Sequence, residues 1–534
     1  MVHDRPILTN KFYLYLTEFF SGVSVMAVEL GASRLMAPYF SSSQIVWTII
    51  IGTIMIALAL GNLWGGRMAD KDPNTDRLYR RLLIAAVWIA AIPVLGKYVI
   101  LGISGALVLT VNTNFLIIAA FCACTVIFVF PLFLLGTVTP SLVKYTVDSL
   151  DDNGKTVGAL GACNTIGSIL GTFLPTFVTI PAVGTAVTFL LFSGILMAIC
   201  LVYFISSRVQ WKTCLVAVIL FVLCAIVGNS SSFAFWEDDL TYEGESVYNY
   251  LQVKETEKQV ILSTNVLFGV QSVMMKDDGL TGMYYDYALA APVMAGVQER
   301  DQPRILILGN GTGTYARQCA KYFPQAQVEG VEIDEKITAL AYEYFDMPET
   351  VDVTTYDGRA YLHAVDTQYD VILVDAYQDI TIPFQMSSTE FFTLVRDHLS
   401  PGGVMVVNLN MTSDGEGSIN KALCDTIASV FPQVRTIDVP RTTNRELFAS
   451  MEGDLAARLT ENLNHVTDSE LSRHLTEAAK ELEPYQGGDN ILTDDQAPVE
   501  VLGMRAIDGL IQKELEYYQE KYRTEGISGI LQSF

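Results

Sequence analysis

Acidic side chains follow successive strand-like runs in the second half of this chain. Glu332 ends the run VEGVEI, Asp357 follows VDVTTY, and Asp375 follows YDVILV. Because parallel strands present their carboxyl ends at one edge of a sheet, we expect these three carboxylates to lie close together. Carboxylates in such a place can bind hydroxyl groups, hold cationic amines or accept a proton during catalysis.

A glycine turn precedes the first of these acids. The segment ILILGNGTGTYARQC reads as strand, turn and helix, with Gly309, Gly311, Thr312 and Gly313 in the turn. Glycines there let the backbone pass close to a nucleoside cofactor. Glu332 lies 19 residues beyond Gly313, which is close to the usual distance for an acid that binds ribose hydroxyls.

The pair Asp357 and Gly358 follows the third strand of this unit, where an adenine edge would lie. Asp357 has a second interpretation, because aspartate before glycine is also common in simple turns. A glycine pattern alone is weak evidence for a ligand, whereas glycines together with these acids favour a nucleoside site.

Strand and helix runs alternate from residue 304 onward, which predicts a doubly wound, Rossmann-like α/β sheet of the kind found in methyltransferases. Shorter runs of alternating apolar and polar residues precede them and predict a small antiparallel sheet. We therefore divide the chain into a helical membrane domain at 1–230, a small β-sheet at 231–300, and a nucleoside-binding catalytic domain with a helical tail at 301–534.

The first 230 residues contain apolar runs long enough to cross a bilayer, which takes roughly 20 residues each. We predict seven spans, near residues 12–36, 44–64, 82–103, 115–137, 160–178, 185–205 and 213–228. No cleavable signal peptide is evident, so the first helix is expected to stay in the membrane. The lipid bilayer is the first partner that the sequence predicts.

Charge divides the chain in the same way. Residues 1–230 carry 13 basic and 9 acidic side chains, whereas the remainder carries 21 and 49, so the net charge of −24 belongs to the second half. A field of that sign attracts cations and repels nucleic acid, although acidity also keeps domains soluble. The five histidines and eight cysteines show no metal-type spacing, and we expect neither a metal nor a nucleic-acid partner.

Motifs across the second half resemble the spermidine/spermine synthase family of aminopropyltransferases. The segments ESVYNYLQV, GVQSV, VEID, YDG and ILVDAY match family segments, and AVELGASRLMAPYF with GNLWGGRMADK is typical of the bacterial branch fused to a multi-pass membrane domain. The resemblance implies decarboxylated S-adenosylmethionine as co-substrate and a polyamine such as putrescine as acceptor, with methylthioadenosine released. Soluble family members are dimers or larger, so it also implies a homo-oligomer.

The resemblance assigns roles residue by residue. Asp375 takes the position of the catalytic base or orienting carboxylate. The nucleoside site includes Asn249, at the position of a family glutamine, and Gln271, together with the glycine turn, Glu332, Asp357 and Gly358. The amine site falls on Tyr284, Tyr285, Asp286, Tyr377 and Asp379.

Several positions depart from the family pattern, and two of them concern groups that bind an ammonium. Thr312 stands where the synthases have an aspartate that binds the aminopropyl ammonium, and Gln378 stands where they have a second amine-binding aspartate. Asp379, or Asp494 and Asp495 in the segment LTDDQAPVE, could supply the missing charge. Two adjacent aspartates before a proline are more often loop and cap residues.

Three interpretations of function remain open. The first is a membrane-bound aminopropyltransferase, favoured by Glu332, Asp357 and Asp375. The second is a methyltransferase that uses intact S-adenosylmethionine, which Thr312 permits. The third is a transporter or sensor that binds polyamine or nucleoside without turnover.

The side of the membrane is also open. Basic loops such as 65–81 are expected in the cytoplasm, which with seven spans would place the second half outside. The co-substrate is made in the cytosol, and on that ground we predict a cytoplasmic catalytic half in a multi-pass protein of the cell membrane.

Overall fold

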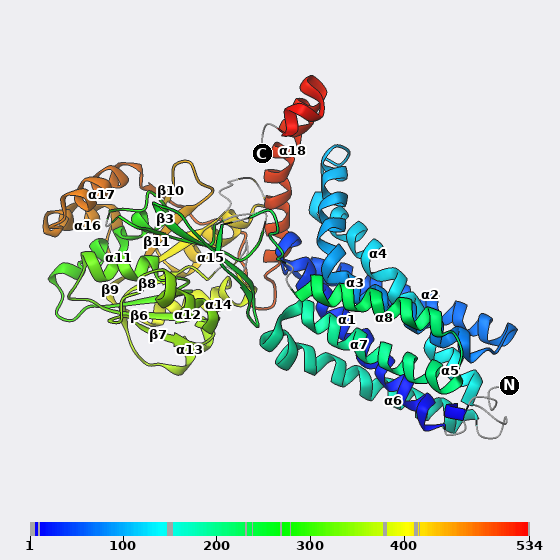
Figure 1. The fold of residues 1–534 in the computed structure, drawn as a ribbon. Helices are drawn as coiled ribbons and strands as arrows, with labels where there is room; N and C mark the ends of the chain where they lie inside the picture. Colours follow the sequence, from blue (N-terminus) through cyan, green and yellow to red (C-terminus); the bar gives the residue numbers. More distant parts are fainter. Residues whose placement is uncertain are drawn as a thin grey trace.

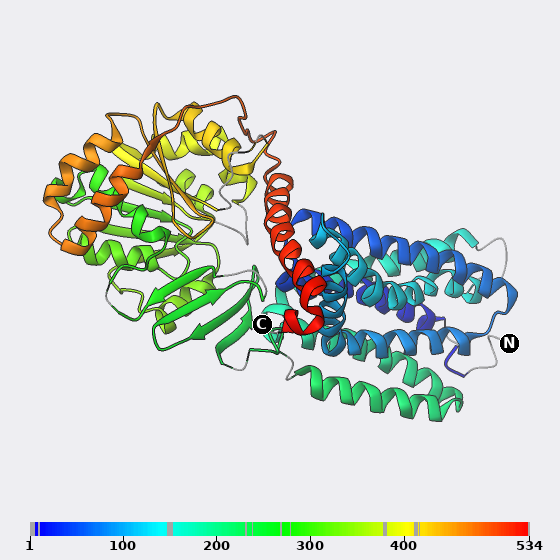
Figure 2. The same ribbon diagram turned by 90° about the horizontal axis from the view of Figure 1, so that it is seen from above.

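A helical bundle and an α/β half lie end to end in the computed structural model (Figure 1). The structure describes residues 6–8, 11–146, 153–229, 232–237, 239–266, 270–277, 279–376, 382–410, 415 and 417–531. Seen from above, the helix α18 (Val499–Leu531) leaves the α/β half and packs beside the bundle (Figure 2). The last helix of the chain therefore joins the two halves a second time.

Helices make up the first half of the chain. They are α1 (Phe12–Phe40), α2 (Gln44–Lys71), α3 (Thr75–Val108), α4 (Phe115–Gly136), α5 (Val138–Thr146), α6 (Asn153–Leu174), a short π-helical turn (Pro175–Thr179), α7 (Ile180–Ser207) and α8 (Trp211–Asn229). A 3₁₀ turn, Pro6–Leu8, precedes α1. In a bilayer every backbone polar group must be bonded internally, and helices achieve this within each segment.

Six helical runs among the described residues are long and apolar enough to cross a membrane, where seven separate spans were predicted. The predicted spans at 160–178 and 185–205 belong to one helical run, Gly154–Ser207. Helical hydrogen bonding continues through the π-helical turn, and no polar loop separates the two apolar stretches. Only Gly184, with φ 79° and ψ 169°, has a non-helical backbone in this region.

The two parts of this run pass the first helix in opposite directions. Contacts with α1 define both directions: Gly167 with Phe19 and Gly171 with Val23 for α6, and Phe189 with Gly31 and Ile199 with Tyr13 for α7. Residue numbers rise together along α1 and α6, so these two helices are parallel. Along α7 they fall as those of α1 rise, so α7 is antiparallel to α1. The chain therefore folds back at Gly184, where a glycine tolerates the positive φ.

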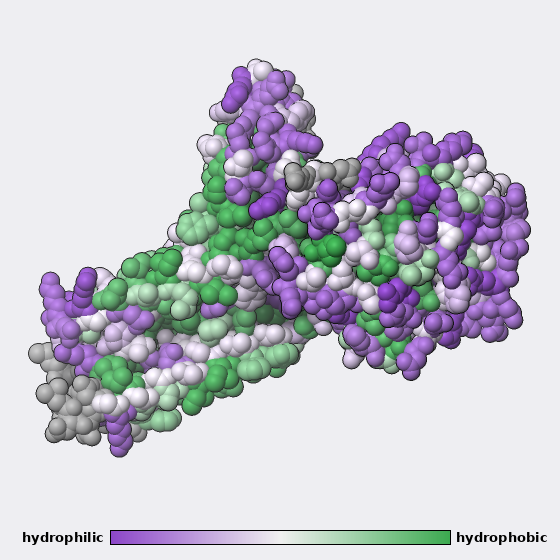
Figure 3. All heavy atoms as spheres, turned by 180° about the vertical axis from the view of Figure 1, so that it is seen from behind, coloured by the Kyte–Doolittle hydropathy of each residue, from purple (hydrophilic) through white to green (hydrophobic). Residues whose placement is uncertain are grey.

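The surface of the bundle is apolar. Large side chains such as Leu63, Ile205, Trp211 and Ile226 are exposed there. The space-filling view shows hydrophobic residues along the bundle and hydrophilic residues over the α/β half (Figure 3). An apolar belt of this extent is typical of a surface that faces lipid.

The small sheet follows the bundle and is antiparallel, as predicted. Its order is β1 (Leu240–Glu245), β2 (Tyr250–Glu255), β3 (Gln259–Ser263) and β4 (Ser272–Met275). The alternating runs of the sequence predicted the last three strands. Strand β1 was missed because glycine and acidic residues interrupt its alternation, LTYEGE.

The large sheet has the predicted doubly wound core. Its eight strands lie in the order β12-β10-β11-β9-β8-β5-β6-β7, and β9, β8, β5, β6 and β7 are parallel. The strands are β5 (Arg304–Leu308), β6 (Gln327–Glu332), β7 (Asp352–Thr355), β8 (Tyr369–Val374), β9 (Leu399–Leu409), β10 (Gln433–Asp438), β11 (Arg445–Ser450) and β12 (Glu483–Pro484). Only the two-residue edge strand β12 was not expected.

Helices cover both faces of this sheet. They are α9 (Tyr284–Ala288), α10 (Ala290–Met294), α11 (Thr314–Tyr322), α12 (Glu335–Tyr344), α13 (Gly358–Ala364), α14 (Thr389–Asp397), α15 (Ile419–Val430), α16 (Leu455–Asn462) and α17 (Ser469–Glu481). Alternation along β5 divides the core: Ile305 and Ile307 belong to one hydrophobic cluster, and Leu306 and Leu308 to the other. This two-sided burial holds the strand ends, and the polar residues that follow them, in fixed positions.

Candidate active site

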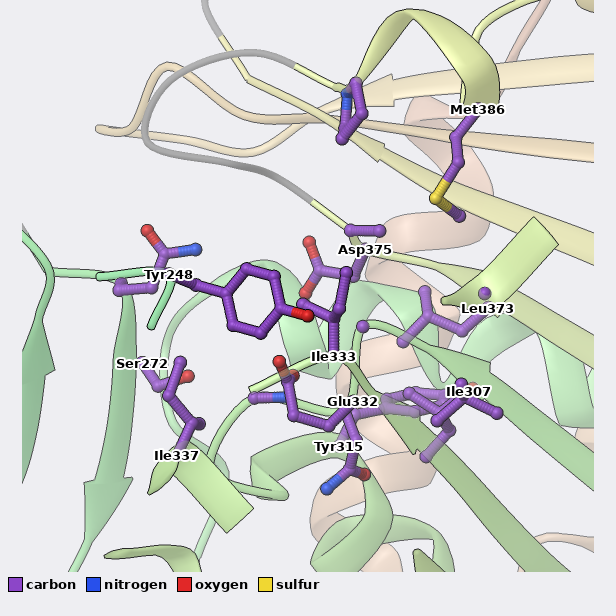
Figure 4. A pocket seen from close by; sticks show the side chains of 18 of the residues that line it. Tyr248, Ser272, Ile307, Tyr315, Glu332, Ile333, Ile337, Leu373, Asp375 and Met386 are labelled. Atoms are coloured by element: carbon purple, nitrogen blue, oxygen red, sulfur yellow. The ribbon is translucent and has the colours of Figure 1, made fainter. Parts of the chain in front are cut away.

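A cavity of about 250 Å³ opens at the carboxyl ends of the parallel strands, between the two sheets. Figure 4 shows Tyr248 and Ser272 on one side, Ile307 and Leu373 on the other, and the acids Glu332 and Asp375 between them. The position is the one that doubly wound sheets use for ligands. The acids predicted to converge therefore do so.

The glycine turn forms the floor of this cavity. Gly309 has φ 87°, and a side chain there would overlap the backbone carbonyl of Asp375. Glycine is therefore required for β5 and β8 to approach so closely. Gly311 lines the cavity and donates its backbone N–H to Glu332 Oε2 at 2.8 Å.

Glu332 is a buried carboxylate at the end of β6. Its Oε1 accepts the backbone N–H of Asp334 at 3.0 Å, in addition to the bond from Gly311. Burial raises the pKa of Glu332 to about 7, and these backbone bonds counteract part of that rise. Both oxygens keep free lone pairs, so a pair of ribose hydroxyls fits the acceptors present.

Two predicted residues reach the cavity from the small sheet. Asn249 lines it and donates its side-chain amide to Asp334 Oδ2 at 3.1 Å. Gln271 also lines it, just before β4. The structure thus brings both together with the glycine turn, as the sequence implied.

Asp357 has two roles in the geometry. Its Oδ1 accepts the backbone N–H of Ala360 at 2.8 Å and caps α13, which is the turn interpretation. Asp357 and Gly358 also line the cavity. The cap uses one carboxylate oxygen and leaves the other available to a ligand.

Asp375 lies directly after β8 and is held by two side chains. Tyr284 donates its hydroxyl to Oδ2 at 2.7 Å, and Asn408 donates its side-chain amide to Oδ1 at 2.9 Å. Burial raises the pKa of Asp375 to about 6, while the two hydrogen bonds act in the opposite direction. Such a carboxylate is ionised at neutral pH and close enough to its pKa to accept a proton.

Tyr284 and Tyr285 lie beside Asp375 or the cavity, whereas Asp286, the next residue, does not. Tyr285 lines the cavity, and its ring lies 4.0 Å from that of Tyr284. Asp286 does not reach the cavity, which corrects its prediction as an amine-binding residue. Its buried carboxylate accepts hydrogen bonds from Thr281, Gly282 and Gln318, and it therefore holds the loop before α9.

The remaining predicted residues are not part of the cavity wall. Thr312 is buried, and its hydroxyl has no partner within the described part of the chain. Gly313, with φ 82°, lies against Met347 instead. Tyr377, Gln378 and Asp379 fall outside the described residues.

Asp494 is engaged elsewhere. Its two oxygens accept bonds from Arg359 at 2.7 and 2.6 Å, and Ser388 donates to it as well. Asp494 thus stabilises a loop, which is the commoner role of adjacent aspartates before a proline. Asp494 therefore does not replace a missing charge at the cavity.

Sequence reasoning missed three residues of the site. Tyr248 lines the cavity, and Asn408 at the end of β9 holds Asp375. Glu446 on β11 pairs in register with Asn408, is fully buried, and has no hydrogen-bond partner for either oxygen among the described residues. An acidic residue inside the apolar run RELFAS was the available signal for Glu446.

Comparisons with known proteins agree with this geometry. Residues 288–449 match the family model described as the spermine/spermidine synthase domain. The chain is 56% identical over 350 residues to a probable polyamine aminopropyl transferase of Bifidobacterium longum, which covers 62% of this chain and 78% of that protein. The chain belongs to the spermine/spermidine synthase family.

More distant relatives carry the same kind of name. The chain is 29% identical over 241 residues to a polyamine aminopropyltransferase of Vibrio vulnificus, covering 43% of this chain and 77% of that protein. A solved probable spermidine synthase from Corynebacterium glutamicum shares 20% identity and a TM-score of 0.35, covering 46% of this chain and 96% of that one. The resemblance found in the sequence is confirmed, and with it the assignment to a family of transferases.

Proposed function

We propose that this protein is a membrane-bound aminopropyltransferase that converts a di- or polyamine, such as putrescine, into its aminopropyl derivative. The co-substrate would be decarboxylated S-adenosylmethionine, and methylthioadenosine would leave. The observation that carries the proposal is Asp375, held by Tyr284 and Asn408 in the same cavity as the buried ribose-type acid Glu332.

The residues suit that chemistry. The sulfonium of the co-substrate supplies an electrophilic methylene group, and the protein must present a neutral amine to it. In our proposal Asp375 accepts a proton from the incoming ammonium, so that the amine nitrogen forms a new C–N bond as the C–S bond breaks. Glu332 holds the ribose in the same cavity, and Tyr285, whose ring lies against that of Tyr284, excludes water beside Asp375.

Product analysis tests this proposal. The purified protein is incubated with putrescine, cadaverine or spermidine and with decarboxylated S-adenosylmethionine, and products are identified by mass spectrometry. We expect methylthioadenosine together with an aminopropylated amine, lost in Asp375→Asn and retained in Asp397→Asn, an exposed acid paired with Arg396. No product from any pair in folded protein would refute the proposal.

A methyltransferase is the second candidate, and Thr312 is the observation that favours it. Threonine supplies no charge for an aminopropyl ammonium, whereas intact S-adenosylmethionine presents no such need. The same experiment with intact S-adenosylmethionine distinguishes the two. A methylated amine with S-adenosylhomocysteine would identify the methyltransferase.

The side of the membrane is part of the proposal. The α/β half adjoins the end of the bundle where α1 finishes (Figure 1). Most basic residues of the bundle lie instead near the start of α1, near the turn between α2 and α3, in α5, at the start of α6, or near the turn between α7 and α8, which is the other end: Lys11, Arg67, Lys71, Arg77, Arg80, Arg81, Lys144, Lys155, Arg208 and Lys212. Basic loops favour the cytoplasm, which would put the α/β half outside. Cytosolic supply of the co-substrate favours the cytoplasmic side, and on that ground we propose it.

Topology mapping decides between these sides. A cytoplasmic α/β half is protected from added protease in intact cells and is cleaved after lysis. Cleavage without lysis would refute this placement and favour binding of an external polyamine or nucleoside without turnover. A homo-oligomer, expected from the resemblance, is checked by light scattering of the detergent-solubilised protein.

A further inference from the structure

The membrane bundle touches the wall of the nucleoside cavity. Arg34, near the end of α1, donates from Nη1 to the backbone carbonyl of Ser246 at 3.3 Å and from Nη2 to the carbonyl of Val247. These carbonyls belong to the turn between β1 and β2, residues 246–249, which we call the rim turn. Tyr248 and Asn249 of this turn line the cavity.

A second membrane helix holds the residue just before the rim turn. Glu245 accepts the backbone N–H of Thr185 at 2.7 Å and its hydroxyl at 2.5 Å. Thr185 follows Gly184, the residue near the start of α7 at which the chain folds back. The rim turn is therefore attached to α1 directly and to α7 through the residue that precedes it, Glu245.

The other side of the rim turn is bonded to the acids of the nucleoside site. Ser246 Oγ donates to Asp334 Oδ2 at 2.5 Å and accepts the backbone N–H groups of Tyr248 and Asn249. Asp334 in turn donates its N–H to Glu332 at 3.0 Å. Hydrogen bonds thus link Arg34, Ser246, Asp334 and Glu332 in succession, and Glu332 is the carboxylate that faces the ribose position.

We infer that Arg34 is a positioning residue for the nucleoside site, so that the membrane bundle forms part of the support of this cavity. The inference rests on the proposed function for the identity of the ligand, an adenosyl compound. The guanidinium of arginine is planar and can donate to two carbonyls at once. A lysine ammonium at the same position could not bond to both carbonyls in this geometry. Without Arg34, the rim turn loses the two bonds that hold the carbonyls of Ser246 and Val247 to α1, and Tyr248 and Asn249 follow directly after these carbonyls.

Binding measurements on the full-length protein in detergent test this inference. Methylthioadenosine and putrescine are titrated separately by calorimetry into wild type, Arg34→Gln and Arg34→Lys. We expect Arg34→Gln to weaken methylthioadenosine binding by about tenfold and Arg34→Lys to weaken it less, while putrescine binding stays within about twofold in both variants. In turnover assays the KM for the adenosyl substrate should rise in these variants, whereas the KM for the amine should not.

Lys97 offers a matched control. It is a second cation at this end of the bundle, and it too donates to a backbone carbonyl, that of Ser232 at 2.7 Å, which does not belong to the rim turn. Lys97→Gln should leave methylthioadenosine binding unchanged. Thr185→Val, which removes one donor to Glu245 from a different helix, should weaken it in the same direction as Arg34→Gln.

Hydrogen exchange gives a readout that needs no ligand. Backbone amides of the rim turn should exchange faster in Arg34→Gln than in wild type or Lys97→Gln. Unchanged exchange and unchanged methylthioadenosine binding in Arg34→Gln would overturn the inference, as would equal losses of both ligands. If the wild type binds no methylthioadenosine, the proposed function fails, and exchange alone then decides whether Arg34 positions the rim turn.

Discussion

Tyr284→Phe should shift the pH dependence of catalysis, because its hydroxyl stabilises the ionised form of Asp375. The bond is 2.7 Å long and ends on a partly buried carboxylate. A hydrogen bond to a charged group contributes about 1.5–3 kcal/mol. Since one pKa unit corresponds to about 1.36 kcal/mol, its loss should raise the pKa of Asp375 by about 1–2 units.

The size of the effect depends on pH. With a pKa of about 6, about nine tenths of Asp375 is ionised at pH 7. A rise of one unit reduces this to about one half, and at pH 5.5 the ionised fraction falls about eightfold. Activity of the variant relative to wild type should therefore be lowest in acid and recover above about pH 8.5.

The assay is release of methylthioadenosine between pH 5.5 and 9, measured by mass spectrometry and expressed as kcat/KM relative to wild type. This ratio cancels the titration of the amine itself. Tyr287→Phe is the matched control, because Tyr287 lies on the same helix but packs against His474, 4.6 Å away. An unmoved acid limb in Tyr284→Phe, or an equal shift in Tyr287→Phe, would refute the reasoning.

Three further predictions follow from contacts around Asp375. Asn408→Leu removes the other donor to this carboxylate and should raise its pKa as well, seen as an alkaline shift of the same limb. Gly309→Ala should lower the free energy of unfolding by about 2–4 kcal/mol in a denaturant titration, because φ is 87° and the added methyl overlaps the Asp375 carbonyl. Burial, with the nearby Asp375 charge, raises the pKa of Glu446 well above 4.5. The protonated acid is compatible with its buried site, so its contribution to stability is fully present below the unfolded pKa of about 4.5 and is lost as pH rises through the higher folded pKa. Glutamine does not ionise, so Glu446→Gln should unfold less readily than wild type at alkaline pH.

The sequence predicted the parts of the site that depend on local pattern. Glu332 and Asp375 follow directly from strand ends, because in a parallel sheet the position of a residue after its strand determines which edge it reaches. Gly309 was predicted from the glycine turn after the first strand, where the backbone can pass close to a nucleoside, and its positive φ is a finding of the structure. Each of these positions depends only on the strand or turn next to it in the sequence.

Contacts between distant segments were not predictable in this way. Asn408 reaches Asp375 only because β9 is paired beside β8, and Glu446 joins them because β11 runs antiparallel to β9. Asp286 was assigned to the amine site from its place in the sequence, but Gly282 in the loop before α9 folds back and donates to its carboxylate, which therefore does not face the cavity. The two spans predicted at 160–178 and 185–205 form one helical run, Gly154–Ser207, because no polar loop separates them and the chain folds back at Gly184 alone.

The carboxylates of the cavity lead to one more consequence for ligand binding. Glu332 and Asp375, with pKa values raised to about 7 and about 6 by burial, are partly protonated near neutral pH. A cation placed beside Asp375 favours its ionised form and lowers its pKa, so binding of a protonated amine must release protons. Putrescine affinity should therefore increase as pH rises from 5.5 to about 7.5, and calorimetry in buffers of different ionisation enthalpy would show the protons leaving. Affinity that stays constant across this range would mean that the amine does not contact Asp375.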